Sequence, residues 1–97
     1  MDRHRTSRLH HIARSDDFLL LIPPGGHAAQ RMRERSISRS EVEKILKAGS
    51  VIRWETDVRG RETWRVAGRD EDGEKIEVVI ALTDNPTAPV LVTVIRL

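Results

Sequence analysis

A histidine and two arginines recur at four-residue intervals in one segment with strong helix-forming character. His27, Arg31 and Arg35 drift by only about 80° around a helix axis, so they would share one stripe. His27 would begin the helix, where the helix dipole favours a neutral imidazole that can take a proton. Guanidinium groups one and two turns along can hold a phosphate. The trio therefore suits metal-free RNA cleavage, with His27 as base for the 2′-hydroxyl and the arginines beside the developing charge.

The same stripe also has a purely structural interpretation. The segment would then be a surface helix whose basic side chains pair with Glu34 or with carboxylates of a sheet. Spacing alone leaves both interpretations open.

Thr93 is a lone polar residue in an otherwise apolar segment. It stands between Val92 and Val94, in the sequence VLVTVIRL. Its hydroxyl could bond a phosphate or orient His27. Alternatively, it is a β-forming residue that bonds a neighbouring strand.

A second basic set lies further along the chain. Arg61, Arg65 and Arg69 alternate along a predicted strand and would form one face. Such a face can follow a nucleic-acid backbone, or it can pair across strands with Glu55 and Glu77.

The two tryptophans alternate in phase with apolar neighbours, Trp54 with Ile52 and Trp64 with Val66. That phase predicts that both fill the core. Base stacking on an exposed indole is the alternative.

The composition excludes several classes of site. Cysteine is absent, so disulfides and thiolate metal sites are excluded. His4, His10 and His11 lie in the N-terminal segment, where the His10-His11 pair has no third metal ligand at a familiar spacing. No apolar run approaches the ~20 residues of a membrane span, and Phe18–Ile22 is too short for a signal-peptide core. We expect a cytoplasmic protein with no metal, no small-molecule cofactor and no membrane partner.

Charge is distributed unevenly along the chain. Residues 1–39 carry eight arginines against four acidic residues, a formal net charge of +4. The remainder carries nine basic and eleven acidic residues, a formal net charge of −2. Residues 1–17 show no apolar period and are predicted to be a flexible basic tail.

Residues 18–97 are predicted to form a single α+β domain. After the loop Pro23–Gly26, one helix is expected over His27–Arg35 and a second over Arg39–Ala48. Ser38 and Glu41 form a capping box for the second helix, and Gly49 ends it.

After the second helix, apolar residues recur at every second position, which predicts strands. They are expected over Val51–Glu55, Thr63–Arg69, Lys75–Leu82 and Val90–Leu97. The joints are too short for parallel crossovers, and Asp72-Gly73 marks a hairpin. The last two segments are apolar on both faces, which predicts central positions in the sheet. The expected fold is two N-terminal helices packed on a mainly antiparallel sheet of about four strands.

The helical segment carries a recognisable motif. It reads His-Ala-x-x-Arg-Met-x-x-Arg-x-Ile-Ser from His27 to Ser38, followed by a Glu-Val helix, a glycine and a final strand with Val-Thr-Val. Over roughly Gly26 to Leu97 the chain resembles a bacterial family of uncharacterised small proteins, related to RelE-like toxins of the barnase, EndoU, colicin and RelE ribonuclease fold.

That resemblance implies a RelE-like fold and a metal-independent endoribonuclease or RNA-binding component of a toxin–antitoxin pair. It implies a zinc-ribbon helix-turn-helix antitoxin as partner. The polar signature of the family falls on His27, Arg31, Arg35 and Thr93. The alternative function is a non-catalytic interaction module that uses the same basic surface.

Overall fold

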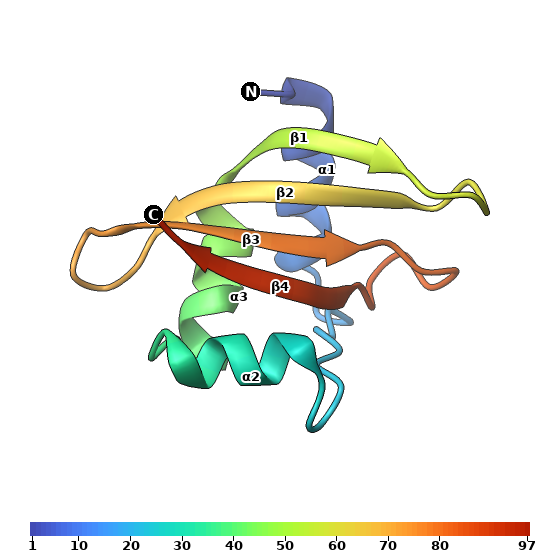
Figure 1. The fold of residues 1–97 in the computed structure, drawn as a ribbon. Helices are drawn as coiled ribbons and strands as arrows, with labels where there is room; N and C mark the ends of the chain where they lie inside the picture. The colour runs from blue at the N-terminus through green and yellow to red at the C-terminus, as the bar shows by residue number, and fades with distance from the viewer.

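Three helices precede a four-stranded antiparallel sheet, so the expected α+β class is confirmed (Figure 1). The computed structural model describes all 97 residues. None of the helices is long and apolar enough to cross a membrane. The elements are α1 (Arg3–Ala13), α2 (His27–Glu34), α3 (Arg39–Ala48), β1 (Ser50–Thr56), β2 (Glu62–Arg69), β3 (Lys75–Ala81) and β4 (Val90–Arg96).

Local sequence signals fix α3 as expected. Ser38 and Glu41 form the capping box, with the Ser38 hydroxyl accepting from the Glu41 amide at 3.1 Å. Gly49 ends the helix with an extended backbone rather than a left-handed one. A Cβ there would lie 2.6 Å from the carbonyl oxygens of Ile45 and Ala67. Glycine is required because α3 and β2 approach each other closely at this point.

The strands pair in sequence order, β1-β2-β3-β4. The predicted hairpin at Asp72-Gly73 is present: Gly73 has a φ of +80°, and the Asp70 carboxylate accepts from two amides of the turn. The prediction of a central position holds for β3 but is wrong for β4, which is an edge strand. Both sides of β4 are apolar because α2 packs against this edge strand. The segment Phe18–Ile22 also lies beside it, where Leu21 pairs with Val90 in a parallel bridge.

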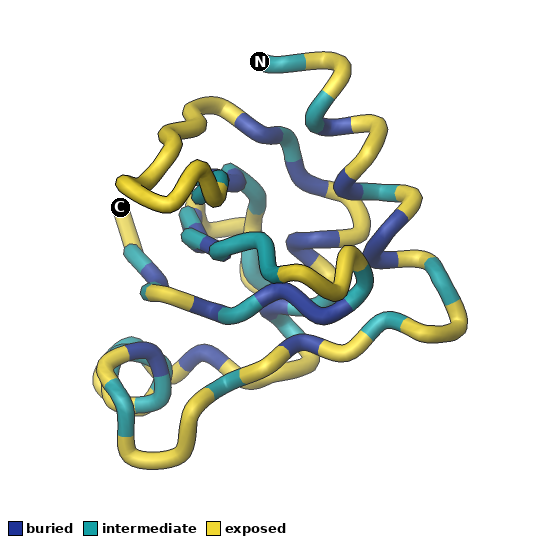
Figure 2. Tube along the Cα trace, turned by 90° about the vertical axis from the view of Figure 1, so that its right-hand side faces the viewer, coloured by how far each residue is buried: buried dark blue, intermediate teal, exposed yellow.

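The helices cover only one face of the sheet. α1 and α3 pack on that face, and α2 lies along the β4 edge (Figures 1 and 2). Trp64 is fully buried among 17 clustered core residues, as predicted. Because no element covers the opposite face, its side chains remain accessible.

The N-terminal segment is not a flexible tail, and that prediction is wrong. It forms α1, which begins at the N-cap Asp2 and buries Leu9, Ile12 and Ala13 in the same core as the sheet. A polar residue, Thr6, completes the buried stripe, and its hydroxyl accepts from the Val51 amide at 2.9 Å. The apolar period of α1 is not visible in the sequence, because the inward position at Thr6 carries a hydroxyl that bonds the edge of β1.

Arg5 fastens α1 to the first hairpin of the sheet. Its guanidinium carbon lies 3.6 Å from the centroid of the Trp54 ring, and its Nε lies 2.8 Å from Glu62. Glu62 also accepts from the Trp64 indole at 2.8 Å. Trp54 is 43% exposed, so the prediction that it fills the core is wrong. Its ring packs against a guanidinium at the sheet edge, where no apolar layer is available.

We predict that Leu9→Ala will lower the free energy of unfolding by about 2–5 kcal/mol, because it leaves a cavity in the core. Leu19→Ala is the matched control, since Leu19 is 54% exposed, and it should change stability by less than about 0.5 kcal/mol. Chemical denaturation of both variants measures the difference. Equal stability of the two variants would mean that α1 does not belong to the cooperative fold.

The ion pair at Glu62 should make stability depend on pH. Hydrogen bonds from Arg5, then from Trp64, lower the pKa of Glu62 below its ordinary 4.5. The contribution of the carboxylate to stability is therefore complete above pH 4.5 and is lost as the pH falls through the folded-state pKa. Glu62→Gln should lower the melting temperature at pH 7, and the deficit should shrink at pH 3. A deficit that is constant across this range would contradict the assignment.

Candidate active site on the open face of the sheet

His27 lies at the start of α2 and reaches β4. Its Nε2 is 3.0 Å from the Thr93 hydroxyl oxygen, and its side chain is exposed. Gly26 is the N-cap of α2, and it has no side chain to accept from the free amides of the first turn. His27 is the first residue of the helix, so its imidazole lies beside the positive end of the helix dipole. The structure therefore brings together the first and last of the residues singled out in the sequence, 66 positions apart.

Contacts farther along α2 fix its position against β4. Ala28 is buried under the first turn. At the other end, Arg96 donates to the carbonyl of Arg35 at 2.9 Å and to Asp70 at 2.8 Å. The Arg96 bond is the largest cause that lowers the pKa of the Asp70 carboxyl. These bonds hold α2 along the edge strand and thereby fix the location of His27.

A one-residue register shift places Thr93 on the open face. Val79 pairs with Thr93 but Ile80 pairs with Leu91, so Val92 is an extra, bulged residue. Leu91 and Val94 can then both face the core while Thr93 faces away from it. A bulge of this kind redirects a side chain without breaking the strand.

Thr93 ends a row of side chains that crosses all four strands. The row contains Arg53, Arg65, Val79 and Thr93, paired from β1 to β4. These four residues, with Trp54, Glu55 and Thr63, line a hollow of about 260 Å³. A second register shift, at Ile52, directly precedes Arg53. Both edge strands therefore bulge immediately before the residue that ends the row.

The other two members of the His27 stripe lie in different surroundings. Arg31 forms an exposed ion pair with Glu34 at 3.2 Å, as the structural interpretation expected. Arg35 is the C-cap of α2, and its Nε is buried without a hydrogen-bond partner. Neither arginine makes a hydrogen bond to His27 or Thr93.

The basic set on β2 is divided in the same way. Arg65 lies on the open face and pairs with Glu77 at 3.3 Å, one of the two carboxylates expected as cross-strand partners. Arg61 precedes the strand and pairs with Asp84 at 3.6 Å. Arg69 donates to the carbonyl of Gly73 at 2.7 Å. Only Arg65 belongs to the row that reaches Thr93.

Arg53 is the residue of this row that the sequence interpretation missed. The turn that joins Asp57 to Arg61 fixes the hairpin register, and that register places Arg53 opposite Arg65. The turn therefore carries the signal, because it determines which residue of β1 lies opposite Arg65.

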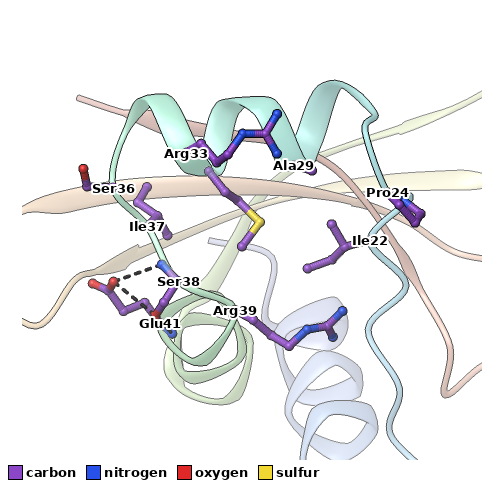
Figure 3. A pocket seen from close by; sticks show the side chains of 10 residues that line it. Ile22, Pro24, Ala29, Arg33, Ser36, Ile37, Ser38, Arg39 and Glu41 are labelled. Atoms are coloured by element: carbon purple, nitrogen blue, oxygen red, sulfur yellow. Dashed lines mark hydrogen bonds between the residues drawn. The ribbon is translucent and has the colours of Figure 1, made fainter.

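The largest hollow lies elsewhere, between α2 and α3. It has a volume of about 570 Å³, with an apolar floor that includes Ile22, Met32 and Ile37 (Figure 3). Arg33 and Arg39 extend from the two helices at its rim (Figure 3). No three side chains of the metal-binding types lie close enough together to hold a metal ion.

A family model matches residues 25–96, under the description "Domain of unknown function (DUF4258)". The chain belongs to this family. No curated protein and no solved structure matches the chain. The DUF4258 region contains α2, α3 and the whole sheet, and hence both His27 and Thr93. α1 lies before the matched region.

The pairing of Arg53 with Arg65 places two like charges directly opposite each other. We predict that Arg53→Thr will raise the free energy of unfolding by about 0.2–1 kcal/mol at low salt, because it removes this repulsion and retains a β-forming residue. The gain should decrease in 1 M salt, which screens exposed charges. Denaturant titrations at both salt concentrations measure it, and a loss of stability at low salt would contradict the repulsion.

Proposed function

We propose that this protein is a RelE-like toxin-family domain that acts on RNA as a metal-independent endoribonuclease. One observation carries the proposal: His27 lies 3.0 Å from Thr93, at the end of a row that also holds Arg65 and Arg53 on an uncovered face. A proton acceptor at the end of a line of cations suits a phosphodiester better than it suits a neutral substrate.

The reaction would be an internal transesterification. In the tautomer whose Nε2 donates to Thr93, the Nδ1 lone pair of His27 is free to take the proton of a 2′-hydroxyl. The 2′-oxygen then forms a bond to phosphorus, the bond from phosphorus to the 5′-oxygen breaks, and water supplies a proton to the leaving oxygen. The products are a 2′,3′-cyclic phosphate and a free 5′-hydroxyl. Thr93 acts as a positioning residue for the imidazole.

The arginines have separate roles in this proposal. Arg65 and Arg53 hold the phosphate backbone on the sheet, since neither is buried. Arg31 is one turn from His27 and can exchange its exposed partner Glu34 for a substrate phosphate. Arg35 lies two turns from His27 and adds positive charge at the C-terminal end of α2. Arg61 and Arg69 flank the backbone path at the two ends of β2.

A non-catalytic RNA-binding module is the second candidate, and one observation favours it. Glu55 is the only carboxylate that lines the hollow, and it lies on β1, three strands from Thr93. At a strand spacing of about 4.8 Å the two positions are about 14 Å apart. Glu55 therefore cannot reach the leaving oxygen at a phosphate beside His27, and Glu77, on the strand next to Thr93, is bound to Arg65 at 3.3 Å.

The hollow between α2 and α3 is where we would place the partner of a toxin domain. Its apolar floor and arginine rim suit an amphipathic segment with acidic flanks. In the proposed function this partner is an antitoxin of the zinc-ribbon helix-turn-helix type.

The test is cleavage of an end-labelled single-stranded RNA by purified protein in the presence of EDTA. His27→Ala should lower the rate by at least about 100-fold, as loss of a general base does. Thr93→Val removes the hydroxyl with little change in shape and should lower kcat more than it raises KM. Arg33→Ala is the matched control, since Arg33 lies on α2 outside the hollow on the sheet. Product ends should be cyclic phosphates, and a 2′-deoxy substitution at the cleaved position should block the reaction.

Induced expression in a host without a cognate antitoxin gives the second readout. Wild type should arrest growth, and His27→Ala should not, at equal levels of folded protein. Cleavage or arrest that survives in His27→Ala would remove His27 from the site. RNA binding without any cleavage by the wild type would leave the non-catalytic module.

A further inference from the structure

The exposed face of α1 carries a concentration of basic side chains. Residues 3–15 contain no carboxylate. Six positions point outward at helical spacing, namely Arg3, His4, Ser7, Arg8, His11 and Arg14. We propose that this face, called here the α1 surface, is a second binding site that takes the phosphate backbone of a nucleic acid.

The α1 surface is separate from the candidate active site. In Figure 2 the buried positions of α1 face the sheet, and the exposed positions face away from it. The open face of the sheet, with Arg53 and Arg65, lies on the opposite side of the molecule (Figure 1). α1 also lies outside the DUF4258 region, so this surface is an addition to the family domain. The proposal does not rest on the proposed cleavage reaction.

Contacts to the fold hold the basic groups in place without neutralising them. Arg14 donates through Nε and Nη2 to the carbonyl of Lys47, which leaves its charge without a carboxylate partner. Arg8 lies 5.3 Å from the centroid of the Trp64 ring and forms no ion pair. By contrast, Arg5 on the inner side of the helix is bound to both Asp2 and Glu62. The charges that face solvent are therefore available to a ligand, while the inward charge is satisfied.

Two hollows run along the α1 surface and share Ser7 and His11. The first has a volume of about 430 Å³ and is lined by His4, Ser7, Arg8, His11, Ile12 and Pro86. The second has a volume of about 470 Å³ and is lined by Ser7, His10, His11, Arg14 and Ser15. Hydroxyl, imidazole and guanidinium groups are the donors that bind phosphate oxygens in protein–nucleic acid complexes.

A nucleic acid fits this surface better than a lipid bilayer does. A helix that lies on a membrane needs an exposed apolar face. The apolar residues of α1 are Leu9, Ile12 and Ala13, and all three are buried in the core. Because the large apolar side chains of α1 are buried, the α1 surface binds mainly through charge and hydrogen bonds, and a regular polyanion is its complement.

The test compares two variants with the same change in charge. Ser7→Glu/His11→Glu places two carboxylates on the α1 surface at exposed positions that make no hydrogen bond through their side chains. Lys44→Glu is the control, because it also changes the net charge by −2 and Lys44 is exposed on α3, paired with Glu71. Fluorescence anisotropy with a 20-nucleotide single-stranded RNA and a 20-base-pair DNA duplex, from 50 to 300 mM salt, measures affinity.

The α1 variant should bind both probes about tenfold or more weakly than Lys44→Glu does, and its plot of log K against log salt should be shallower by one to two units. Equal affinities and slopes for the two variants would overturn the proposal, as would an absence of binding by the wild type at 50 mM salt. Polyglutamate that competes as well as RNA at equal charge would also overturn it and indicate an acidic protein partner. Cleavage of a dinucleotide by the α1 variant should remain at the wild-type level, so failure of the α1 surface is distinguishable from failure of the cleavage site.

Discussion

The pairing register of the sheet is the constraint on which the candidate active site depends. Side chains alternate between faces, so a shift of one residue moves every later side chain to the other face. The bulges at Ile52 and Val92 confine this shift to one point in each edge strand. In β4, Leu91 and Val94 stay buried on the two sides of the bulge, and in β1, Val51 stays buried before it. The polar residue that follows each bulge, Arg53 or Thr93, stays on the open face. The irregular backbone thus reconciles a continuous core with a row of polar side chains.

Segments from the N-terminal half of the chain cover both edges of the sheet. An edge strand presents unpaired backbone groups that other chains can bind. At β1 the Val51 amide and carbonyl are bound by the Thr6 hydroxyl and the Asp2 amide, each at 2.9 Å or less. At β4 the Leu91 amide donates to Leu21, and α2 lies alongside. A helix therefore lies at each edge of the sheet. One face of the sheet can stay open because the backbone groups of both edge strands are partly bonded or covered.

Much of this arrangement follows from local sequence signals, and the failures have physical causes. The capping box at Ser38 fixes α3, and the turn at Gly73 fixes a hairpin, because each depends on neighbours in the chain. α1 was missed because Thr6 completes its buried stripe through a hydrogen bond to a strand 45 residues away. β4 was placed at the centre of the sheet because apolar character cannot distinguish a neighbouring strand from a neighbouring helix. A contact between Thr93 and His27 is one of the alternatives that the lone polar residue of β4 offers, and the family resemblance favours it, whereas placing Arg53 requires the register of two strands together.

In the two proposals above, basic surfaces on opposite sides of the molecule divide binding from chemistry. On the open face Arg65 is paired with Glu77 at 3.3 Å, so Arg53 is the arginine of the row without a carboxylate partner. In the proposed function a small net charge suits the cleavage site, because only interactions that strengthen in the transition state raise the rate of the chemical step. Attraction that is the same in the ground state and the transition state is better supplied away from His27. There it raises the affinity for RNA without holding the reacting phosphate in an unreactive position. α1 meets this requirement because Arg5 and the buried residues Leu9 and Ile12 attach it rigidly to the sheet, while its basic face points away. A nucleic acid held by both surfaces must pass around an edge of a molecule about 31 by 28 by 26 Å across, so long or folded RNA would gain from α1 and a dinucleotide would not.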